Sequence, residues 1–65
     1  MTITLNGEPF ETGAATIAAL LEALAIDPRR VAVERNFVVV KRDLYATTPI
    51  APGDQIEIVN FVGGG

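Results

Sequence analysis

The 65-residue sequence contains no cysteine, no histidine and no serine. Without cysteine, no disulfide can stabilise a small fold, and without cysteine and histidine the usual zinc ligands are missing. A catalytic cysteine and a serine–histidine pair are excluded for the same reason. We therefore expect no metal site and no nucleophilic catalytic residue.

Positive charge and long apolar runs are also scarce. The formal net charge is −3, and the only adjacent basic residues are Arg29–Arg30 and Lys41–Arg42. Proteins that bind nucleic acid carry a clustered basic face. No apolar run approaches the ~20 residues that span a bilayer, and no signal-peptide pattern opens the chain. These absences predict a cytoplasmic protein that binds neither nucleic acid nor membrane.

What remains is enough for one small domain. Hydrophobic residues make up 49% of the chain, which favours a compact fold over disorder. The carboxylates Glu8, Glu11, Glu22 and Glu34 fall on separate predicted elements and form no candidate acid–base pair. Phosphate-binding glycine loops of the GxGxxG or GxxxxGK[ST] type are absent. We therefore predict that the protein is not an enzyme.

The first half of the chain predicts a hairpin followed by a helix. "TITLNGEPFET" alternates, with Ile3, Leu5 and later Phe10 on the core side, and Asn6–Gly7 is typical of a type I′ turn. In "TIAALLEALAI" the apolar residues follow helical spacing. Thr16 is placed to cap this helix of about ten residues, and Asp27–Pro28 is expected to end it.

The second half predicts three more strands. "VAVER" at 31–35 and the short edge strand "FVVVKR" at 37–42 are followed by a turn or single helical turn with Leu44 as its core anchor. "APGD" is typical of a type II turn. "QIEIVNF" alternates, with Ile56 and Ile58 inward. A two-layer α+β domain results, with a mixed four- to five-stranded sheet and one main helix packed on one face.

The chain ends in three glycines that follow this last predicted strand. We expect a folded domain over residues 1–62 and a flexible tail over residues 63–65. Glycine has no Cβ, so this tail can enter a channel too narrow for side chains. Its carboxylate would need activation by another protein, with ATP as the obvious agent.

Most of the docking energy should come from the folded surface, because ordering the glycines costs roughly 1–2 kcal/mol each and they offer no side chains. With Ile56 and Ile58 facing the helix, Val59 and Phe61 face the open side of the sheet. Together with Phe37 or Val39 they form a predicted apolar docking patch.

The whole chain resembles the sulfur-carrier proteins of thiamine biosynthesis, the ThiS type of β-grasp, ubiquitin-like protein. The matching stretches are "ITLNGEPFE", "TIAALLEAL", "VAVERN" and "VKRDLYATTPIAPGDQIEIVNFVGGG". Gly63 precedes the family's terminal diglycine at a variable site. The resemblance implies a monomeric β-grasp domain.

The resemblance also implies a mechanism. A ubiquitin-activating-like enzyme would use ATP to adenylate Gly65, and sulfur from a donor of the cysteine desulfurase type would convert it to a thiocarboxylate. Thiazole synthase would then receive the sulfur. Gly64 is the neighbouring residue without a side chain that this chemistry requires, and Gly63 is expected to enter the partner's channel with it. No permanently bound cofactor is implied.

Two alternatives remain open. One is a sulfur carrier of another pathway, such as the small subunit of molybdopterin synthase, although "NFVGGG" lacks the proline usual there. The other is a ubiquitin-like modifier or a non-covalent interaction module, the last of which would not need the terminus.

Overall fold

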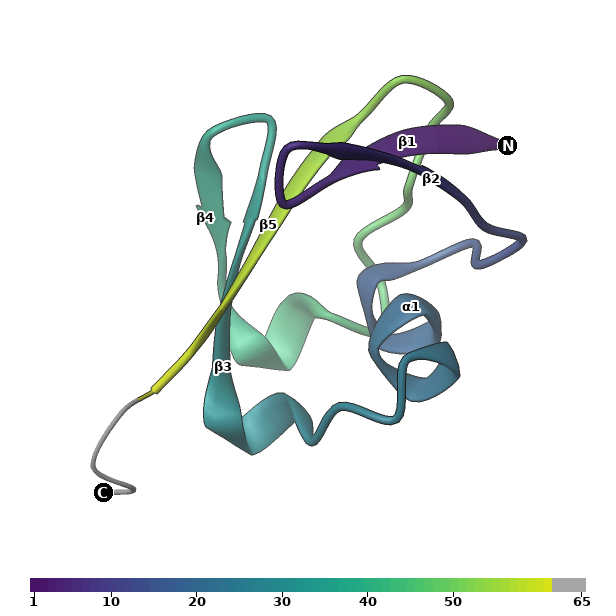
Figure 1. Cartoon of the computed structure of the whole chain (residues 1–65). Coiled ribbons are helices and arrows are strands. Elements are labelled where there is room, and N and C mark those ends of the chain that lie inside the picture. Colours follow the sequence, from purple (N-terminus) through teal and green to yellow (C-terminus); the bar gives the residue numbers. More distant parts are fainter. Residues whose placement is uncertain (62–65) are drawn as a thin grey trace.

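The structure is a computed structural model that describes residues 1–61. These residues form a single sheet with one α-helix packed against one of its faces (Figure 1). The elements, in chain order, are β1 (Thr2–Leu5), β2 (Glu8–Glu11), α1 (Ile17–Ala23), η1 (Pro28–Arg30), β3 (Val31–Arg35), β4 (Val38–Val40), η2 (Arg42–Leu44) and β5 (Gln55–Asn60), where η marks a 3-10 helix.

The sheet is mixed and has five strands in the order β2-β1-β5-β3-β4. β5 lies in the centre, parallel to β1 and antiparallel to β3, and the β1–β2 and β3–β4 pairs are antiparallel hairpins. The predicted α+β architecture is confirmed, as is the edge position of β4. The sheet places the last described strand between the two hairpins.

The turn between β1 and β2 follows the predicted chemistry. Asn6 and Gly7 both have positive φ, at 49° and 83°, as a type I′ turn requires. The Asn6 side chain does more than turn the chain, because its Oδ1 accepts a hydrogen bond of 2.7 Å from the Ile58 amide. It thereby extends the link between β1 and β5 beyond the strand pairing.

The helix starts where it was predicted to start but ends sooner. Thr16 Oγ1 accepts the amide of Ala19 at 3.1 Å, which confirms the N-cap. α1 ends at Ala23 because Ala25 adopts a left-handed φ of 57°. The Ile26 amide donates to the Leu21 carbonyl and the Ala25 amide to that of Glu22, which is a Schellman motif. The expected ending at Asp27–Pro28 is wrong, because alanine takes the place usually held by glycine.

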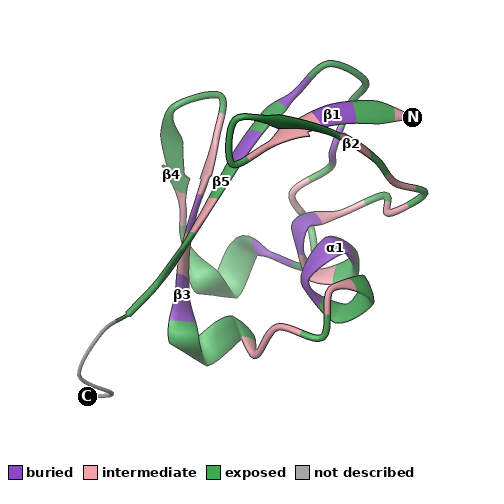
Figure 2. Cartoon of the chain, in the orientation of Figure 1, coloured by how far each residue is buried: buried purple, intermediate pink, exposed green. Residues whose placement is uncertain are grey.

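A single apolar core lies between α1 and the sheet (Figure 2). Its buried members come from every layer and are Ile3, Ile17, Leu20, Leu21, Val31, Val33, Tyr45, Ile50 and Ile56. The expectation that Leu44 anchors the core is wrong. Leu44 is 47% exposed, whereas its neighbour Tyr45 is 5% exposed, and the Tyr45 hydroxyl donates to the Val31 carbonyl at 3.4 Å.

One buried carboxylate ties the turn before β5 to the end of β3. Asp54 is 7% exposed, and its Oδ2 accepts hydrogen bonds of 2.8 Å from both the Ala51 amide and Arg35 Nε. Asn36 Nδ2 donates to Oδ1 at 3.1 Å. In the same turn Gly53 has a φ of 83° and the Asp54 amide donates to the Ala51 carbonyl, as predicted for "APGD".

The environment of Asp54 acts on its pKa in two directions. Burial raises the pKa, but the hydrogen bonds from Ala51, Asn36 and Arg35 together outweigh burial, so the pKa lies below its ordinary value. A carboxyl with a lower pKa in the folded state binds protons more readily when unfolded. Its contribution to stability is therefore present above the unfolded pKa and is lost as pH falls through the folded value.

We predict that Asp54→Asn lowers the free energy of unfolding at pH 7 by about 2 kcal/mol, because the substitution breaks the charge-assisted bond to Arg35 and places two amide donors against each other. The variant should also lose less stability than the parent as pH falls below about 4. Urea denaturation followed by circular dichroism measures both effects. Asp43→Asn is the matched control, since Asp43 is exposed. Equal stability of the Asp54 variant and the parent would contradict the assigned role.

Candidate functional site

The root of the predicted tail is held firmly to the sheet. β5 pairs with β3 from Ile56 to Asn60, and the amide of Phe61 donates to the Arg30 carbonyl at 2.9 Å. Gly63, Gly64 and Gly65 lie outside the described residues, so their predicted roles stay predictions. The described chain thus reaches Phe61 with its backbone still bonded to the domain.

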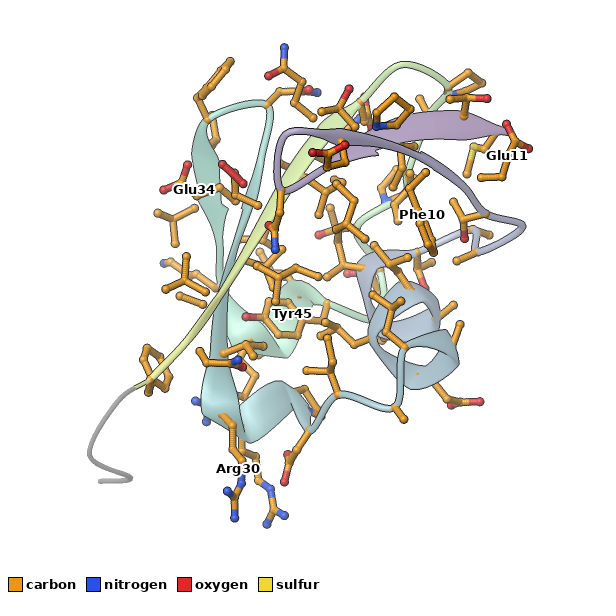
Figure 3. The ribbon with its side chains drawn as sticks, in the orientation of Figure 1. Phe10, Glu11, Arg30, Glu34 and Tyr45 are labelled. Atoms are coloured by element: carbon orange, nitrogen blue, oxygen red, sulfur yellow. The ribbon has the colours of Figure 1, made fainter. Side chains whose placement is uncertain are left out.

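The sheet has one face covered by α1 and one face without a covering element among residues 1–61. Figure 3 shows Tyr45 between the sheet and the helix and Glu34 on the other side. Strand alternation and the printed register assign this second face, here called the open face, to its members. On β3, β4 and β5 they are Ala32, Glu34, Val39, Gln55, Glu57 and Val59, followed by Phe61, and β1 adds Thr4 beside Gln55.

The predicted docking residues are exposed. Phe37, Val39, Val59 and Phe61 have exposed fractions of 74%, 68%, 61% and 54%. Figure 2 shows β4 and the end of β5 in the colour of exposed residues. Their exposure is confirmed, whereas their role in docking stays a prediction.

The four residues do not form one continuous patch. Val59 lies opposite Ala32, and Val39 lies opposite Glu34, so β3 separates these two residues and they occupy neighbouring rows of the open face. Phe61 continues the same face at the end of β5. Phe37, by contrast, sits in the turn between β3 and β4, at the end of the sheet remote from Phe61 (Figure 1). The structure therefore separates Phe37 from the apolar residues beside the tail.

Phe37 has an unusual backbone for an aromatic residue. Asn36 and Phe37 join Arg35 to Val38 in a two-residue turn, and both have positive φ, at 52° and 69°. The second position of a type I′ turn strongly favours glycine. A large side chain in this conformation is strained, and here it is also exposed. Phe37 therefore lowers the stability of this turn, and its exposed ring is a candidate for contact with another protein.

Charges at the root of the tail are partly paired. Arg29 donates to Asp27 through Nε at 3.1 Å and Nη2 at 2.9 Å, and Arg30 Nε lies 3.9 Å from the same carboxylate. The hydrogen bond from Arg29 lowers the pKa of Asp27 to about 2. Asp27 is thus ionised at neutral pH and engages Arg29, while the side chain of Arg30 remains 82% exposed.

The other side of the molecule carries a hollow of about 440 Å³ between α1 and η2. Leu21, Ile26 and Tyr45 contribute to its apolar lining, and Arg42 and Glu22 are among its polar residues. It lies on the helix side and does not include any open-face residue. Within residues 1–61 no group of three metal-ligating side chains occurs, and no helix has the length and apolarity needed to cross a membrane.

The pairing of two glutamates on the open face was not predicted from the sequence. Glu34 and Glu57 lie directly opposite each other on adjacent strands. Each was visible as a charged residue in an alternating strand, but their pairing depends on the register between β3 and β5. No local signal reports that register, because the two residues are separated by a turn, β4, η2 and a long loop.

The ThiS family model matches residues 3–65 of this chain. The sulfur carrier protein ThiS of Bacillus subtilis is 35% identical over 65 residues, covering 97% of this chain and 98% of that protein. The crystal structure of the thiamine biosynthesis protein ThiS from Geobacter metallireducens superposes with a TM-score of 0.86 at 36% identity, and the match covers 100% of both chains.

A longer protein also matches over the full chain. The thiazole synthase of Magnetococcus marinus is 48% identical over 66 residues, which covers 100% of this chain. The matched region is 20% of that synthase, so the chain spans about a fifth of its length.

We predict that Phe37→Gly raises the free energy of unfolding by about 1 kcal/mol, since glycine adopts positive φ without strain and the lost side chain is exposed. Ala25→Gly relieves the strain of a positive φ at the end of α1 in the same way and is the matched control. Both should raise the midpoint of urea denaturation. A destabilised Phe37→Gly variant beside a stabilised Ala25→Gly variant would show that the Phe37 side chain packs against the domain.

Proposed function

Because this chain belongs to the ThiS family, we propose that it carries sulfur for thiamine biosynthesis as a thiocarboxylate on Gly65. The observation that carries the proposal is the match of the family model over residues 3–65, which includes the three glycines. The full-length similarity to a sulfur carrier protein ThiS supports the same function. The fold agrees with it, since the Geobacter metallireducens ThiS structure has the same β-grasp architecture.

The proposed chemistry takes place on the terminal carboxylate. One of its oxygens attacks the α-phosphorus of ATP, pyrophosphate leaves, and an acyl-adenylate forms. The terminal sulfur of a protein persulfide then attacks the acyl carbon and AMP leaves. A thiol cleaves the resulting S–S bond and releases the thiocarboxylate. The chain has no Cys, His or Ser to catalyse these steps, so its partners supply the catalytic groups.

Three partners follow from this chemistry. A ubiquitin-activating-like enzyme would bind and consume the ATP, so the carrier itself needs no bound cofactor. A donor of the cysteine desulfurase type would supply the persulfide. Thiazole synthase would take the sulfur, and the similarity of this chain to a fifth of one thiazole synthase supports that partnership. We place the protein in the cytoplasm, as a carrier and not as an enzyme.

The folded surface would supply most of the docking energy. The glycine tail can form only main-chain hydrogen bonds in an extended groove of the partner. Ordering it costs roughly 1–2 kcal/mol of backbone entropy per residue. Val59 and Phe61 lie exposed on the open face beside the root of the tail, and Val39 lies exposed on the same face in the row of Glu34. Burying them against a partner would hold the domain while the tail enters the active site. Phe37 would reach only a partner that also covers the β3–β4 turn.

We predict that incubation with ATP, an adenylating enzyme and a persulfide donor replaces one oxygen of the Gly65 carboxyl group by sulfur. Intact-mass analysis followed by fragmentation of the C-terminal peptide locates the change. A variant with one alanine added after Gly65 should stay unmodified, because its carboxylate is displaced and carries a side chain. An isopeptide bond to lysine in place of sulfur would support a protein modifier, and an unmodified chain beside an enzyme active on its own carrier would contradict the proposal.

A further inference from the structure

The chain contains a single side-chain amine, that of Lys41, because its other basic residues are all arginines: Arg29, Arg30, Arg35 and Arg42. A guanidinium group stays protonated in proteins and is no nucleophile, whereas a lysine amine attacks acyl groups once it has lost its proton. Cysteine, histidine and serine are absent, and the only phenol, that of Tyr45, is 5% exposed. Lys41 is therefore the strongest side-chain nucleophile that the chain can direct at an activated acyl group.

Lys41 lies on the open face, in the row of Ala32 and Val59. Its backbone is extended, with φ −69° and ψ 144°, so it continues β4 past Val40, which pairs with Val33. The next row therefore places Lys41 beside Ala32, and Ala32 pairs with Val59 on its other side. Neighbouring strands are about 4.8 Å apart, so the Cα atoms of Lys41 and Val59 are about 10 Å apart. Only the small side chain of Ala32 lies between them.

The side chain of Lys41 is not engaged in an ion pair within residues 1–61. It is exposed, whereas the guanidinium groups of Arg29 and Arg35 hold carboxylates at 2.9 and 2.8 Å. Moving the Lys41 amine therefore breaks no ion pair of the described domain. Its four-carbon stem is flexible, so the amine can turn towards the root of the tail.

The length of the tail is sufficient to bring Gly65 to Lys41. Phe61 is fixed by its amide bond to the Arg30 carbonyl and lies two residues beyond Val59, which places it about 12 Å from the Lys41 Cα atom. Four residues lead from Phe61 to Gly65, and an extended chain advances at most about 3.6 Å per residue, or about 14 Å in total. The reach exceeds the gap even before the lysine stem is counted.

The amino group of Met1 is the one other amine of the chain, and it is out of reach. β1 runs parallel to β5 with Thr4 beside Gln55, so Met1 lies beyond the start of β5. The six residues from Gln55 to Phe61 span about 20 Å, which is more than the reach of the tail. The Met1 amine also donates to the Thr12 carbonyl at 2.9 Å. Only Lys41 therefore combines an amine with a position near the tail.

We propose that Lys41 is a self-modification site: when no persulfide is supplied, its amine attacks the acyl-adenylate of Gly65 and forms an isopeptide bond within the same chain. This inference rests on the proposed function. The neutral Nζ bonds to the acyl carbon, the bond from that carbon to the AMP oxygen breaks, AMP leaves, and the nitrogen releases a proton to water. ATP and the adenylating enzyme are the only co-reactants, and nothing is oxidised or reduced.

The product, here called the closed chain, has no free terminal carboxylate and is withdrawn from sulfur transfer. Two groups joined by a short flexible segment meet at an effective concentration in the mM range. The Lys41 amine therefore has an advantage over the lysines of other proteins in reacting with an acyl-adenylate that leaves the enzyme. The reaction would end a stray activated carrier on itself and would spare other proteins from acylation.

The first test needs no partner protein. The full chain is prepared with Gly65 as the thioester of a small thiol, which activates the same carbonyl carbon. Lys41 should displace the thiol and give a monomer with the mass of the parent less one water, and fragmentation should show a Lys41–Gly65 linkage. Hydrolysis to the parent without this linkage overturns the proposal. A linkage between two chains that increases with protein concentration overturns it as well.

Three variants test the position of the amine. Lys41→Arg keeps the charge and should lose the closed chain. Adding Val59→Lys to it returns an amine to the same row of the open face and should restore closure. Adding Ala51→Lys instead places the amine at an exposed site before β5 and should give at least ~10-fold less closed chain than the parent. Equal yields from the Ala51 and Val59 variants would show that the sheet does not select the amine, which overturns the proposal.

The second test uses the adenylating enzyme. With ATP and no sulfur source the parent should form the closed chain, and addition of the persulfide donor should divert it to the thiocarboxylate. Hydroxylamine traps an acyl-adenylate as a hydroxamate and so reports adenylation separately. A hydroxamate on Gly65 without any closed chain overturns the proposal and leaves the proposed function intact. Absence of the hydroxamate contradicts the proposed function, and the thioester reaction then decides the role of Lys41.

Discussion

The position of β5 between β1 and β3 is the constraint on which the rest of the structure depends. β5 is parallel to β1 and antiparallel to β3, so it joins two hairpins that share no other strand pairing. Two asparagine side chains reinforce it from either side. Asn6 Oδ1 accepts the Ile58 amide at 2.7 Å, and Asn36 Oδ1 accepts the Gln55 amide at 2.8 Å. Because these contacts span long stretches of sequence, the sheet closes only when β5 is in place.

This arrangement matters for the proposed function. A carrier whose end must enter another active site needs a rigid body immediately before a thin tail. The central strand of the sheet provides that body, since its backbone is bonded on both sides and remains bonded to Arg30 at Phe61. Asp54 fixes the start of the same strand through Arg35, Asn36 and Ala51. Both ends of β5 are therefore tied to the domain.

Two features of the domain oppose its stability. Phe37 holds a positive φ while its ring is exposed, and Glu34 faces Glu57 across the sheet. Both lie away from the core that α1 covers. Unfavourable features in a small domain are commonly found where it contacts something else. Phe37 lies in the turn between β3 and β4, and Glu34 and Glu57 lie on β3 and β5, so both features lie outside the core that folds the domain.

Much of the fold was determined by local sequence. Asn6–Gly7, the alternation of each strand, the Thr16 cap and Pro52–Gly53 act within a few residues, so turns, strands and the start of the helix could be predicted. Local errors arose where the signal was missing or ambiguous. Ala25 ends the helix without glycine, and the choice between Leu44 and Tyr45 as core residue depended on the direction in which η2 leaves the sheet.

The three glycines and the apolar residues of the last strand were likewise read from sequence, because their chemistry is a property of the residues themselves. The partnership of Glu34 with Glu57 and the separation of Phe37 from Phe61 were decided only by tertiary structure. The physical reason is that these relations depend on which strands pair and in which register. That choice follows from burying the whole core at once, and no short stretch of the chain contains it.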